Sequence, residues 1–468
     1  MENGCYKLSW RERIGFSSGD LAQNLIYQTV SIWLLFFYTN VYGLKPSVSA
    51  VMFLVVRIID VIWDPVVGAF IDKANPRWGK YRSWLIFAGV PLAAFAILCF
   101  WNGFSGSLLY AYVTYVGMSM CFTLINVPYS ALNSSLTRDT HEITVLTSVR
   151  MFMANLAGLI IKTLPLVIAI FAPKAYNADT GRMEAVYNTP ESAGAWFITM
   201  SIFALTGLAL LVWCFFESKE RIVMDAKDTE NVKVSDLWME LVRNRPLRVL
   251  SFFFIVAYTT MSISNAADSY FMTYNIGATP FMTTAFMWLG TIPAFIFLPL
   301  VPAIKKKIGK AGMFRLFLGI SVVGMILMYA VISVPAFKSC FPLLCVVQFI
   351  KSAGVLVATG YMWALVPEVV TFGEYTTGRR VAAIVGSLIC IFMKAGMALG
   401  GVIPGLVLAW VGFDSAAKIQ TPLAEQGILW LVTLIPAVLF VLAIFIIGKY
   451  ELSDERMDEI NMEIAKRR

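Results

Sequence analysis

The feature that most constrains this chain is a series of long apolar segments. A transmembrane helix needs about 20 predominantly apolar residues. By that measure the 468-residue sequence holds about twelve spans. We place them at residues 20–42, 48–71, 84–101, 108–132, 143–172, 195–216, 249–274, 280–303, 313–334, 341–366, 381–411 and 427–448. Because lipid offers no partners to exposed backbone polar groups, this pattern predicts an all-α polytopic membrane protein.

Composition supports this fold class and excludes several functions. Only 14% of the residues are charged, against about a quarter in soluble domains. The net charge of +8 comes from loops beside apolar spans, so no nucleic acid is expected as a partner. With His141 as the single histidine and no CxxC among seven cysteines, we expect no tightly bound metal, no cofactor and no disulfide framework. We find no nucleophile–base constellation and no phosphate-binding loop, so no enzyme is expected. The first sixteen residues hold no apolar run before a cleavage site, so we expect no signal peptide.

The distribution of Lys and Arg predicts the orientation in the membrane. An even number of spans puts both termini on one side, and that side carries most of the basic loop residues. Basic loops stay in the cytoplasm, so we expect both termini there.

A long polar stretch predicts the domain organisation. It separates an N-terminal six-helix bundle (1–216) from a C-terminal six-helix bundle (249–448), with a cytoplasmic linker over 217–248 and a cytoplasmic tail over 449–468. RWGKYRSW after the second span is weakly echoed by KIGKAGMFRL after the eighth. Two six-span halves are typical of the major facilitator fold, whose substrate site lies between the halves near the middle of the membrane.

The second span carries three charged residues on one face. Arg57, Asp60 and Asp64 are spaced i, i+3 and i+7 on a helix. Charges at this depth cost several kcal/mol unless paired or hydrated, so they indicate a functional site. Two carboxylates one turn apart can hold a small cation or share a proton. The alternative is a structural ion pair of Arg57 with one aspartate. The hairpin that follows holds Arg77 and Lys80, which we assign with Arg57 to structure or gating.

The first span places a polar stripe at a similar depth. Asp20, Gln23, Asn24 and Tyr27 lie on one side of a helix. If that helix starts near Arg11, Asp20 lies roughly 14 Å along its axis. The alternative is that Asp20 is an N-cap at the cytoplasmic surface.

The fourth and fifth spans add an amide and a guanidinium. Asn126 precedes Pro128 by two residues, which predicts a disturbed backbone beside a polar group. The alternative is that Asn126 only forms an ordinary hydrogen bond between helices. Arg150 lies near mid-depth, and its planar fork suits bidentate bonding to a carboxylate or to adjacent hydroxyls. Pairing Asp20 with Arg150 would neutralise both and frame a site for a polyol.

The second half holds fewer charges within the spans. Asp268 is expected to be hydrated near the outer end of the seventh span, while Lys351 and Lys394 lie within the tenth and eleventh. One interpretation is that Lys394 provides a fixed positive charge that balances the carboxylates of the other half.

The turn before the eleventh span is also charged. It holds Glu368, Glu374, Arg379 and Arg380, for which a solvated cytoplasmic ion-pair cluster is the favoured interpretation. We assign Glu368, Glu374 and Arg379 to structure or gating.

These motifs resemble a known family, the glycoside–pentoside–hexuronide:cation symporters of the melibiose permease type, over nearly the whole chain. The resemblance rests on GDLAQNLIYQ, RIIDVIWDPVVGAFIDKANPRWGKYRSW, NVPYSAL, FGEYTTGRR and FMKAGMALGG. It implies a twelve-helix major facilitator fold and uptake of a sugar or glycoside driven by Na+ or H+. It also implies site residues: Asp60 and Asp64 as cation carboxylates, Thr123 and Lys394 near the cation, Asp20 and Arg150 as the sugar-binding pair, and Tyr27 beside the sugar.

The sequence also departs from the family pattern. Asn126 stands where melibiose permease has a third aspartate, which weakens a Na+ cage more than a proton site, because Na+ needs several hard oxygens. Ser130 and Thr359 replace two tryptophans, which puts melibiose itself in doubt as the substrate.

The expected function is symport of a glycoside, pentoside or hexuronide with H+ in preference to Na+, by alternating access. Asn126 is expected to bridge the sugar and cation sites, and any Na+ at Asp60 and Asp64 would be a transported ion. The expected location is the bacterial cytoplasmic (inner) membrane, with lipid as a partner. The alternatives are a lysolipid or amphiphile transporter of the same superfamily and a sugar sensor that does not transport.

Overall fold

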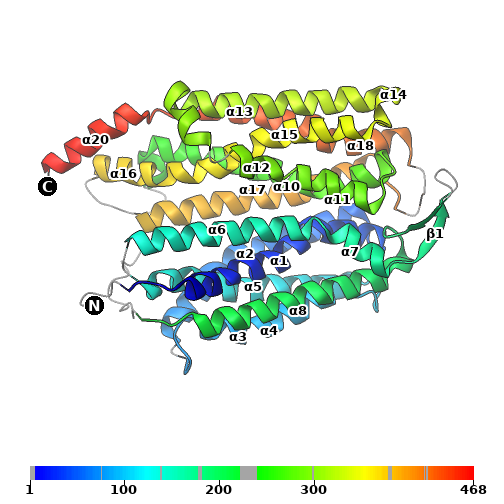
Figure 1. Cartoon of the computed structure of the whole chain (residues 1–468), viewed down its shortest axis with the longest axis horizontal. Helices are drawn as coiled ribbons and strands as arrows, with labels where there is room; N and C mark the ends of the chain where they lie inside the picture. Colours follow the sequence, from blue (N-terminus) through cyan, green and yellow to red (C-terminus); the bar gives the residue numbers. More distant parts are fainter. Residues whose placement is uncertain are drawn as a thin grey trace. The chain divides into compact units, whose positions relative to one another are not determined.

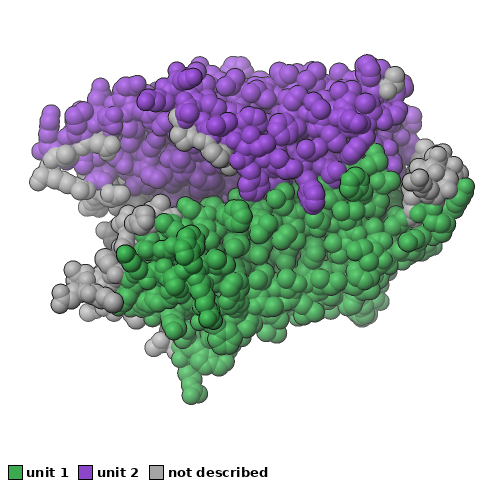
Figure 2. All heavy atoms as spheres, viewed as in Figure 1, with its two compact units in different colours: residues 1–230, 279–284, 414–418 green, residues 231–278, 285–413, 419–468 purple. Residues whose placement is uncertain are grey.

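A computed structural model describes residues 6–74, 76–137, 140–177, 182–221, 240–297, 300–377, 382–415, 417 and 420–467. These residues are almost entirely helical (Figure 1). They divide into two compact units, coloured separately in Figure 2. Unit 1 comprises residues 1–230, 279–284 and 414–418, and unit 2 comprises 231–278, 285–413 and 419–468. The predicted boundaries at 216/217, 248/249 and 448/449 are finer than this division and stay predictions.

Among its described residues, unit 1 contains eight α-helices, a 3-10 turn at Pro190–Ser192 and a short hairpin. They are α1 (Trp10–Asn40), α2 (Pro46–Lys73), α3 (Ser83–Phe87), α4 (Gly89–Cys99), α5 (Leu108–Leu136), α6 (Thr140–Ile161), α7 (Leu164–Phe171), the antiparallel strands β1 (Lys174–Asn177) and β2 (Arg182–Ala185), and α8 (Ala193–Glu217). Helix α5 continues through Pro128 without a break, so the disturbance predicted there is not found. Between α6 and α7 the chain bends by 42°, where Pro165 opens the second helix.

The start of α1 is fixed by a capping box. Ser9 is the N-cap, its hydroxyl accepts a bond from the Glu12 backbone N–H, and the Glu12 side chain accepts one from the Ser9 N–H. Asp20 therefore lies ten residues inside the helix, and the alternative that it is an N-cap is wrong.

Ion pairs then hold this end of α1 against distant parts of unit 1. Arg13 Nη2 lies 2.7 Å from Glu142 Oε2, with Glu142 buried and Arg13 partly buried. Arg11 Nη2 lies 2.7 Å from Glu217 Oε1, and Arg221 pairs with Glu12. The base of α1 is thereby fixed to α6 and to the end of α8.

Unit 2 contains the remaining helices. They are α10 (Arg245–Tyr270) with a π-helical turn at Phe271–Asn275, α11 (Pro280–Leu289), whose first turn is grouped with unit 1, α12 (Ile292–Phe297), α13 (Val301–Ser333), α14 (Pro335–Lys338), α15 (Phe341–Tyr361) with a 3-10 turn at Met362–Leu365, α16 (Val366–Thr377), α17 (Ala382–Trp410), α18 (Pro422–Val432), α19 (Leu434–Ile447) and α20 (Asp454–Arg467).

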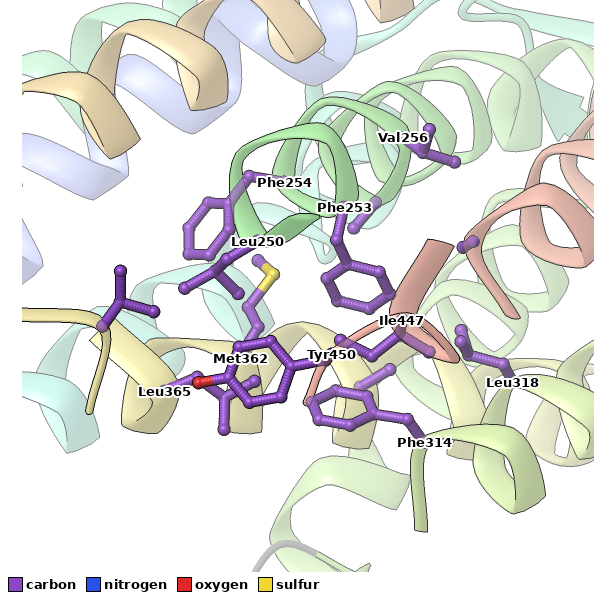
Figure 3. Close-up of a cluster of buried hydrophobic side chains, with 14 of the residues drawn as sticks. Leu250, Phe253, Phe254, Val256, Phe314, Leu318, Met362, Leu365, Ile447 and Tyr450 are labelled. Carbon is purple, nitrogen blue, oxygen red and sulfur yellow. The ribbon is translucent and has the colours of Figure 1, made fainter. Parts of the chain in front are cut away.

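The core of unit 2 joins several of these helices. Figure 3 shows Phe253 of α10, Phe314 of α13, Met362 of the 3-10 turn and Tyr450 after α19 packed into one buried cluster. In lipid, helix association depends on close packing and interhelical hydrogen bonds rather than on hydrophobic exclusion. A cluster of interlocking side chains from several helices is therefore what holds the unit together.

Helices α13 and α15 also approach each other closely at small residues. A Cβ on Gly324 would lie 2.6 Å from Lys351 Cα, so only glycine fits. Ser321 Oγ donates to Lys351 O over 2.7 Å on the same face. This small-residue contact is the kind that brings membrane helices together.

Among the described residues, eight helices are long and apolar enough to cross a membrane, or nine if the bent pair α6–α7 is one span. Three segments that we predicted as spans are not among them: α1, with its polar stripe, α2, with three charges in its middle, and the shorter segment Ser83–Cys99. The all-α polytopic fold is confirmed, whereas the number twelve and the cytoplasmic termini stay predictions.

Candidate functional site

Helix α2 brings Arg57 and Asp60 together as an ion pair. Arg57 Nη1 lies 3.3 Å from Asp60 Oδ2, and both side chains are nearly buried. Ser119 of α5 donates to Asp60 Oδ1, so each carboxylate oxygen accepts a bond. The pairing that we considered as a structural alternative is therefore present. It gives Asp60 a permanent countercharge.

Asp64 lies one turn further along the same helix. Its Oδ1 accepts a hydrogen bond from Thr123 Oγ1 over 3.2 Å. It is partly exposed, whereas Asp60 is 5% exposed. The structure thus places Thr123 beside the second carboxylate, and the two aspartates have different surroundings. Among the described residues, no three His, Cys, Asp or Glu side chains gather into a potential metal site.

Asp20 of α1 and Arg150 of α6 form a second ion pair in unit 1. Arg150 Nε lies 2.6 Å from Asp20 Oδ2 and Nη2 lies 3.2 Å from Oδ1, a bidentate contact. Tyr129 of α5 donates to Asp20 Oδ2 over 2.8 Å. Both charged side chains keep 16% of their surface exposed. The pair is therefore fixed in geometry and still reachable by a solute.

Two aromatic rings hold the Arg150 guanidinium in place. Its Cζ lies 4.9 Å from the centroid of the Tyr129 ring and 5.5 Å from that of Phe16, and the two rings stack with centroids 4.8 Å apart. Cation–π contacts of this kind stabilise a cation by about 0.5–2 kcal/mol. Tyr129 therefore supports both members of the Asp20–Arg150 pair.

Tyr27 lies against the charged residues of α2. Its hydroxyl accepts a bond from Arg57, and its ring stacks on Phe122 with centroids 4.2 Å apart. The resemblance implied a place beside the sugar, whereas the contact that the structure shows is with the partner of Asp60. Since Tyr27 and Asp20 lie two turns apart on α1, this helix joins the two ion pairs.

Asn126 of α5 bonds to α1. Its Nδ2 donates to Gln23 Oε1 over 3.2 Å. Asn126 is exposed, and it lies one turn from Thr123 on α5, while Gln23 lies one turn from Asp20 on α1. The amide pair is thus positioned between the two carboxylate sites.

The basic hairpin after α2 is anchored to the segment after α8. The backbone N–H groups of Lys80, Tyr81 and Arg82 donate to the Glu220 carboxylate at 2.8–3.0 Å. Arg77 is exposed. A fixed hairpin is compatible with the structural or gating role predicted for Arg77 and Lys80, which stays a prediction.

The predicted charges of unit 2 lie in other surroundings. Lys351 Nζ lies 3.4 Å from Asp268 Oδ1, and the two side chains are 3% and 13% exposed. Asp268 is therefore paired with Lys351, whereas we expected it to be hydrated. Lys394 lies on α17 and is partly buried. Its role near the cation stays a prediction.

Of the cluster expected to be solvated, Glu368 is partly buried and pairs with a buried lysine. Lys310 Nζ lies 2.7 Å from Glu368 Oε1 and 2.9 Å from Asp454 Oδ1, and the Lys310 side chain is 4% exposed. Tyr450 donates to Glu368 Oε2 over 3.2 Å. Glu374 lies on α16, partly buried. Arg379 and Arg380 lie outside the described residues.

Sequence reasoning missed two members of the site, Ser119 and Tyr129, and did not give a role to Gln23. Ser119 lies one turn before Thr123 on α5, so helical spacing could have indicated it. Tyr129 lies one turn after Asn126 and was read as part of NVPYSAL without a role of its own.

Long apolar helices that carry buried or partly buried ion pairs are typical of multi-pass membrane transporters. The model of the family described as MFS/sugar transport protein matches residues 15–454, and the chain belongs to this family. This confirms the predicted resemblance to sugar:cation symporters and the expected membrane location.

Individual relatives agree with this assignment. An uncharacterized symporter of Bacillus subtilis strain 168 is 42% identical over 98% of this chain and 96% of its own length. The glucuronide carrier protein homolog of Escherichia coli strain K12 is 31% identical over 99% and 97%. The crystal structure of a D-xylose-proton symporter is 16% identical, covers 95% of this chain and 98% of that one, and has a TM-score of 0.62. At that identity the likeness shows the fold alone.

Proposed function

We propose that this protein imports a glycoside, pentoside or hexuronide together with a cation, H+ in preference to Na+, by alternating access. The observation that carries the proposal is the joint placement of the Asp20–Arg150 pair and the Asp60/Asp64 carboxylates within unit 1, linked through α1. Coupling between two ligands requires that both bias one conformational equilibrium, and two sites on shared helices are well placed to do so. The names of the glucuronide carrier homolog and of the Bacillus subtilis symporter agree with this class.

The Asp20–Arg150 pair supports a sugar site. It is neutral as a whole, partly exposed and held rigid by Tyr129, so it offers a fixed acceptor beside fixed donors. Adjacent hydroxyls of a sugar both donate and accept, and they match a carboxylate–guanidinium pair better than an apolar molecule does. Burying a charged pair without such a ligand is costly in a membrane.

The carboxylates of α2 support cation coupling. Asp60 bonds to Arg57 and Ser119, so Asp64 is the one that we assign to the coupling ion. A Na+ cage needs several hard oxygens, whereas a proton needs a single carboxylate. With an amide at Asn126 and an arginine on Asp60, the surroundings favour a proton over Na+.

Coupling follows if both ligands favour the same conformation. Proton loading at Asp64 would change the bonds of Thr123, and Asn126 lies one turn further along α5, bonded to Gln23 beside the sugar pair. Ligands that bias one equilibrium raise each other's affinity reciprocally. We further propose that bundles 1–216 and 249–448 move against each other around the linker 217–248. The termini and the tail 449–468 would lie in the cytoplasm of a bacterium.

Uptake into proteoliposomes tests this function. Labelled glycosides, pentosides and hexuronates are each supplied under an imposed proton gradient and, separately, an imposed sodium gradient. We expect one class of sugar to accumulate under the proton gradient, and accumulation only under the sodium gradient would reverse the ion assignment. Sugar binding without accumulation under either gradient would instead support a facilitator or a sensor.

A further inference from the structure

Gln23 of α1 is a buried amide with an unused donor. Its side chain is 2% exposed, and Nε2 is enclosed without a hydrogen-bond partner among the described residues. Leaving a buried donor unpaired costs about 1–3 kcal/mol, so each such group in a native structure needs an explanation. A donor kept for a ligand is one such explanation.

The orientation of this amide is fixed by its other end. Gln23 Oε1 accepts a bond from Asn126 Nδ2 over 3.2 Å. With the oxygen bonded to Asn126 of α5, the Nε2 donor is directed away from that residue within the plane of the carboxamide. Gln23 therefore offers a donor in one direction rather than a freely rotating group.

The position of Gln23 relates this donor to the sugar pair. Gln23 lies three residues after Asp20 on the same face of α1, which is a rise of about 4.5 Å. Asp20 is partly exposed and Asn126 is exposed. The buried amide thus lies one turn from the partly exposed Asp20 and is bonded to the exposed Asn126.

We propose that Gln23 selects the transported sugar by donating from Nε2 to one hydroxyl or carboxylate oxygen of the ring that Asp20 and Arg150 hold. This inference rests on the proposed function and names a specificity residue of the same site. A site built to bond a given oxygen rejects analogues that lack it, because the buried group is then left unpaired. Gln23 thereby adds a third fixed contact to the two made by the ion pair.

A purely structural role for Gln23 predicts a different result. If the amide only joined α1 to α5, its loss would weaken the binding of every sugar by a common factor. If it contacts one oxygen, its loss matters only for sugars that carry that oxygen. Comparing a sugar with its monodeoxy analogues separates the two roles.

The experiment uses the full-length protein in lipid nanodiscs and isothermal titration calorimetry. The probes are methyl β-D-glucuronide, methyl β-D-galactoside and methyl β-D-xyloside, each with its monodeoxy analogues. We expect Gln23→Leu to weaken a bound parent sugar about tenfold. The monodeoxy analogue that lacks the contacted oxygen is expected to bind wild type and Gln23→Leu equally. The other analogues are expected to bind Gln23→Leu about tenfold more weakly than wild type.

Gln28→Leu is the matched control on the same helix. Gln28 Nε2 already donates to Asn24 Oδ1 over 2.8 Å, so its donor is used within the protein. We expect this variant to bind all probes like wild type. If Gln23→Leu does not fold, Gln23→Met, which keeps the length of the side chain, takes its place.

Two results overturn the inference. A uniform loss across all analogues, or no loss for any, means that Gln23 contacts no sugar oxygen. If wild type binds none of the three probes, the proposed sugar function fails and this inference falls with it. Because that failure is seen in wild type, the two outcomes are distinguishable.

Discussion

Arg57 and Asp60, one turn apart on α2, form an ion pair with Nη1 3.3 Å from Oδ2. Asp64, the next carboxylate on that face, bonds to Thr123 instead. The two aspartates of α2 therefore have different surroundings. Asp60 is paired with the Arg57 guanidinium, so Asp64 is the better candidate for binding and releasing the coupling ion.

Replacing Asp64 with Asn is expected to abolish accumulation while sparing sugar binding. The amide cannot be protonated or hold a cation, but it keeps the size of the side chain and a partner for Thr123. We expect the inside-to-outside sugar ratio in proteoliposomes to fall to about one, with the calorimetric affinity within about threefold of wild type.

Asp60→Asn is the comparison for that variant. It leaves Arg57 buried without its carboxylate, which is expected to cost about 3–5 kcal/mol of stability. Accumulation of sugar at the wild-type level by the Asp64→Asn variant would contradict the cation-site assignment.

Arg150→Lys is expected to weaken sugar binding more than Tyr129→Phe. Lysine cannot reproduce the bidentate contact with Asp20, and a bond between charged groups contributes about 1.5–3 kcal/mol, so the affinity should fall at least tenfold. Tyr129→Phe removes one bond to Asp20 and keeps the ring beneath Arg150, so a loss of about threefold to tenfold is expected.

Calorimetry with the sugar that wild type transports measures both losses, and Tyr112→Phe on the same helix is the control. Equal affinity in wild type and Arg150→Lys would mean that Asp20 and Arg150 are a structural pair only.

Gly324→Ala is expected to destabilise unit 2. The added Cβ would lie 2.6 Å from the Lys351 backbone, so α13 and α15 must move apart. Overpacking of this kind costs about 1–3 kcal/mol. The matched control is Gly319→Ala on α13, where a Cβ meets nothing within 4 Å. Thermal unfolding in detergent measures both, and an equal melting temperature for the two variants would refute the close contact.

Asp454→Asn is expected to release α20 from unit 2. Asp454 Oδ1 lies 2.9 Å from Lys310 Nζ, and Oδ2 lies 3.1 Å from Lys305 Nζ. Hydrogen exchange of residues 454–467 should become faster in this variant. Asp458→Asn, an exposed position on the same helix, should leave it unchanged. Slow exchange in Asp454→Asn would show that other contacts hold the helix.

The same contact sets a pH dependence. Burial opposes ionisation of the Asp454 carboxyl, but its bonds to Lys310 and Lys305 outweigh burial, and its pKa lies below the ordinary 3.8. A carboxyl whose pKa is lowered by folding stabilises the attached helix at every pH above its ordinary pKa. This stabilisation is lost as the pH falls from the ordinary pKa through the lowered one. Attachment of α20 should therefore be constant near neutral pH and weaken only below about pH 3.8.

Helical spacing predicted part of the site from the sequence alone. The stripe Arg57, Asp60, Asp64 and the depth of Asp20 follow from residues per turn. The start of α1 was also readable, because Ser9 and Glu12 have the spacing of a capping box before a helix. Overlooking it left open the alternative that Asp20 is an N-cap.

Other contacts could not be derived, because they depend on how separate helices pack. Asp268 and Lys351 are 83 residues apart, and neither position indicates the other. Tyr27 likewise reaches Arg57 only because α1 and α2 face each other there. Local sequence patterns constrain which face of a helix is polar, whereas the residue that each polar side chain contacts is set by tertiary structure.

The ion pairs at the base of α1 bear on how the protein is made. Arg11 pairs with a residue 206 positions later in the chain, and Arg13 with one 129 positions later. The first helix leaves the ribosome well before either partner exists. Arg13 therefore lacks its countercharge until synthesis has passed residue 142, and Arg11 lacks its own until synthesis has passed residue 217, so the base of the first helix is fixed only when α8 has been made.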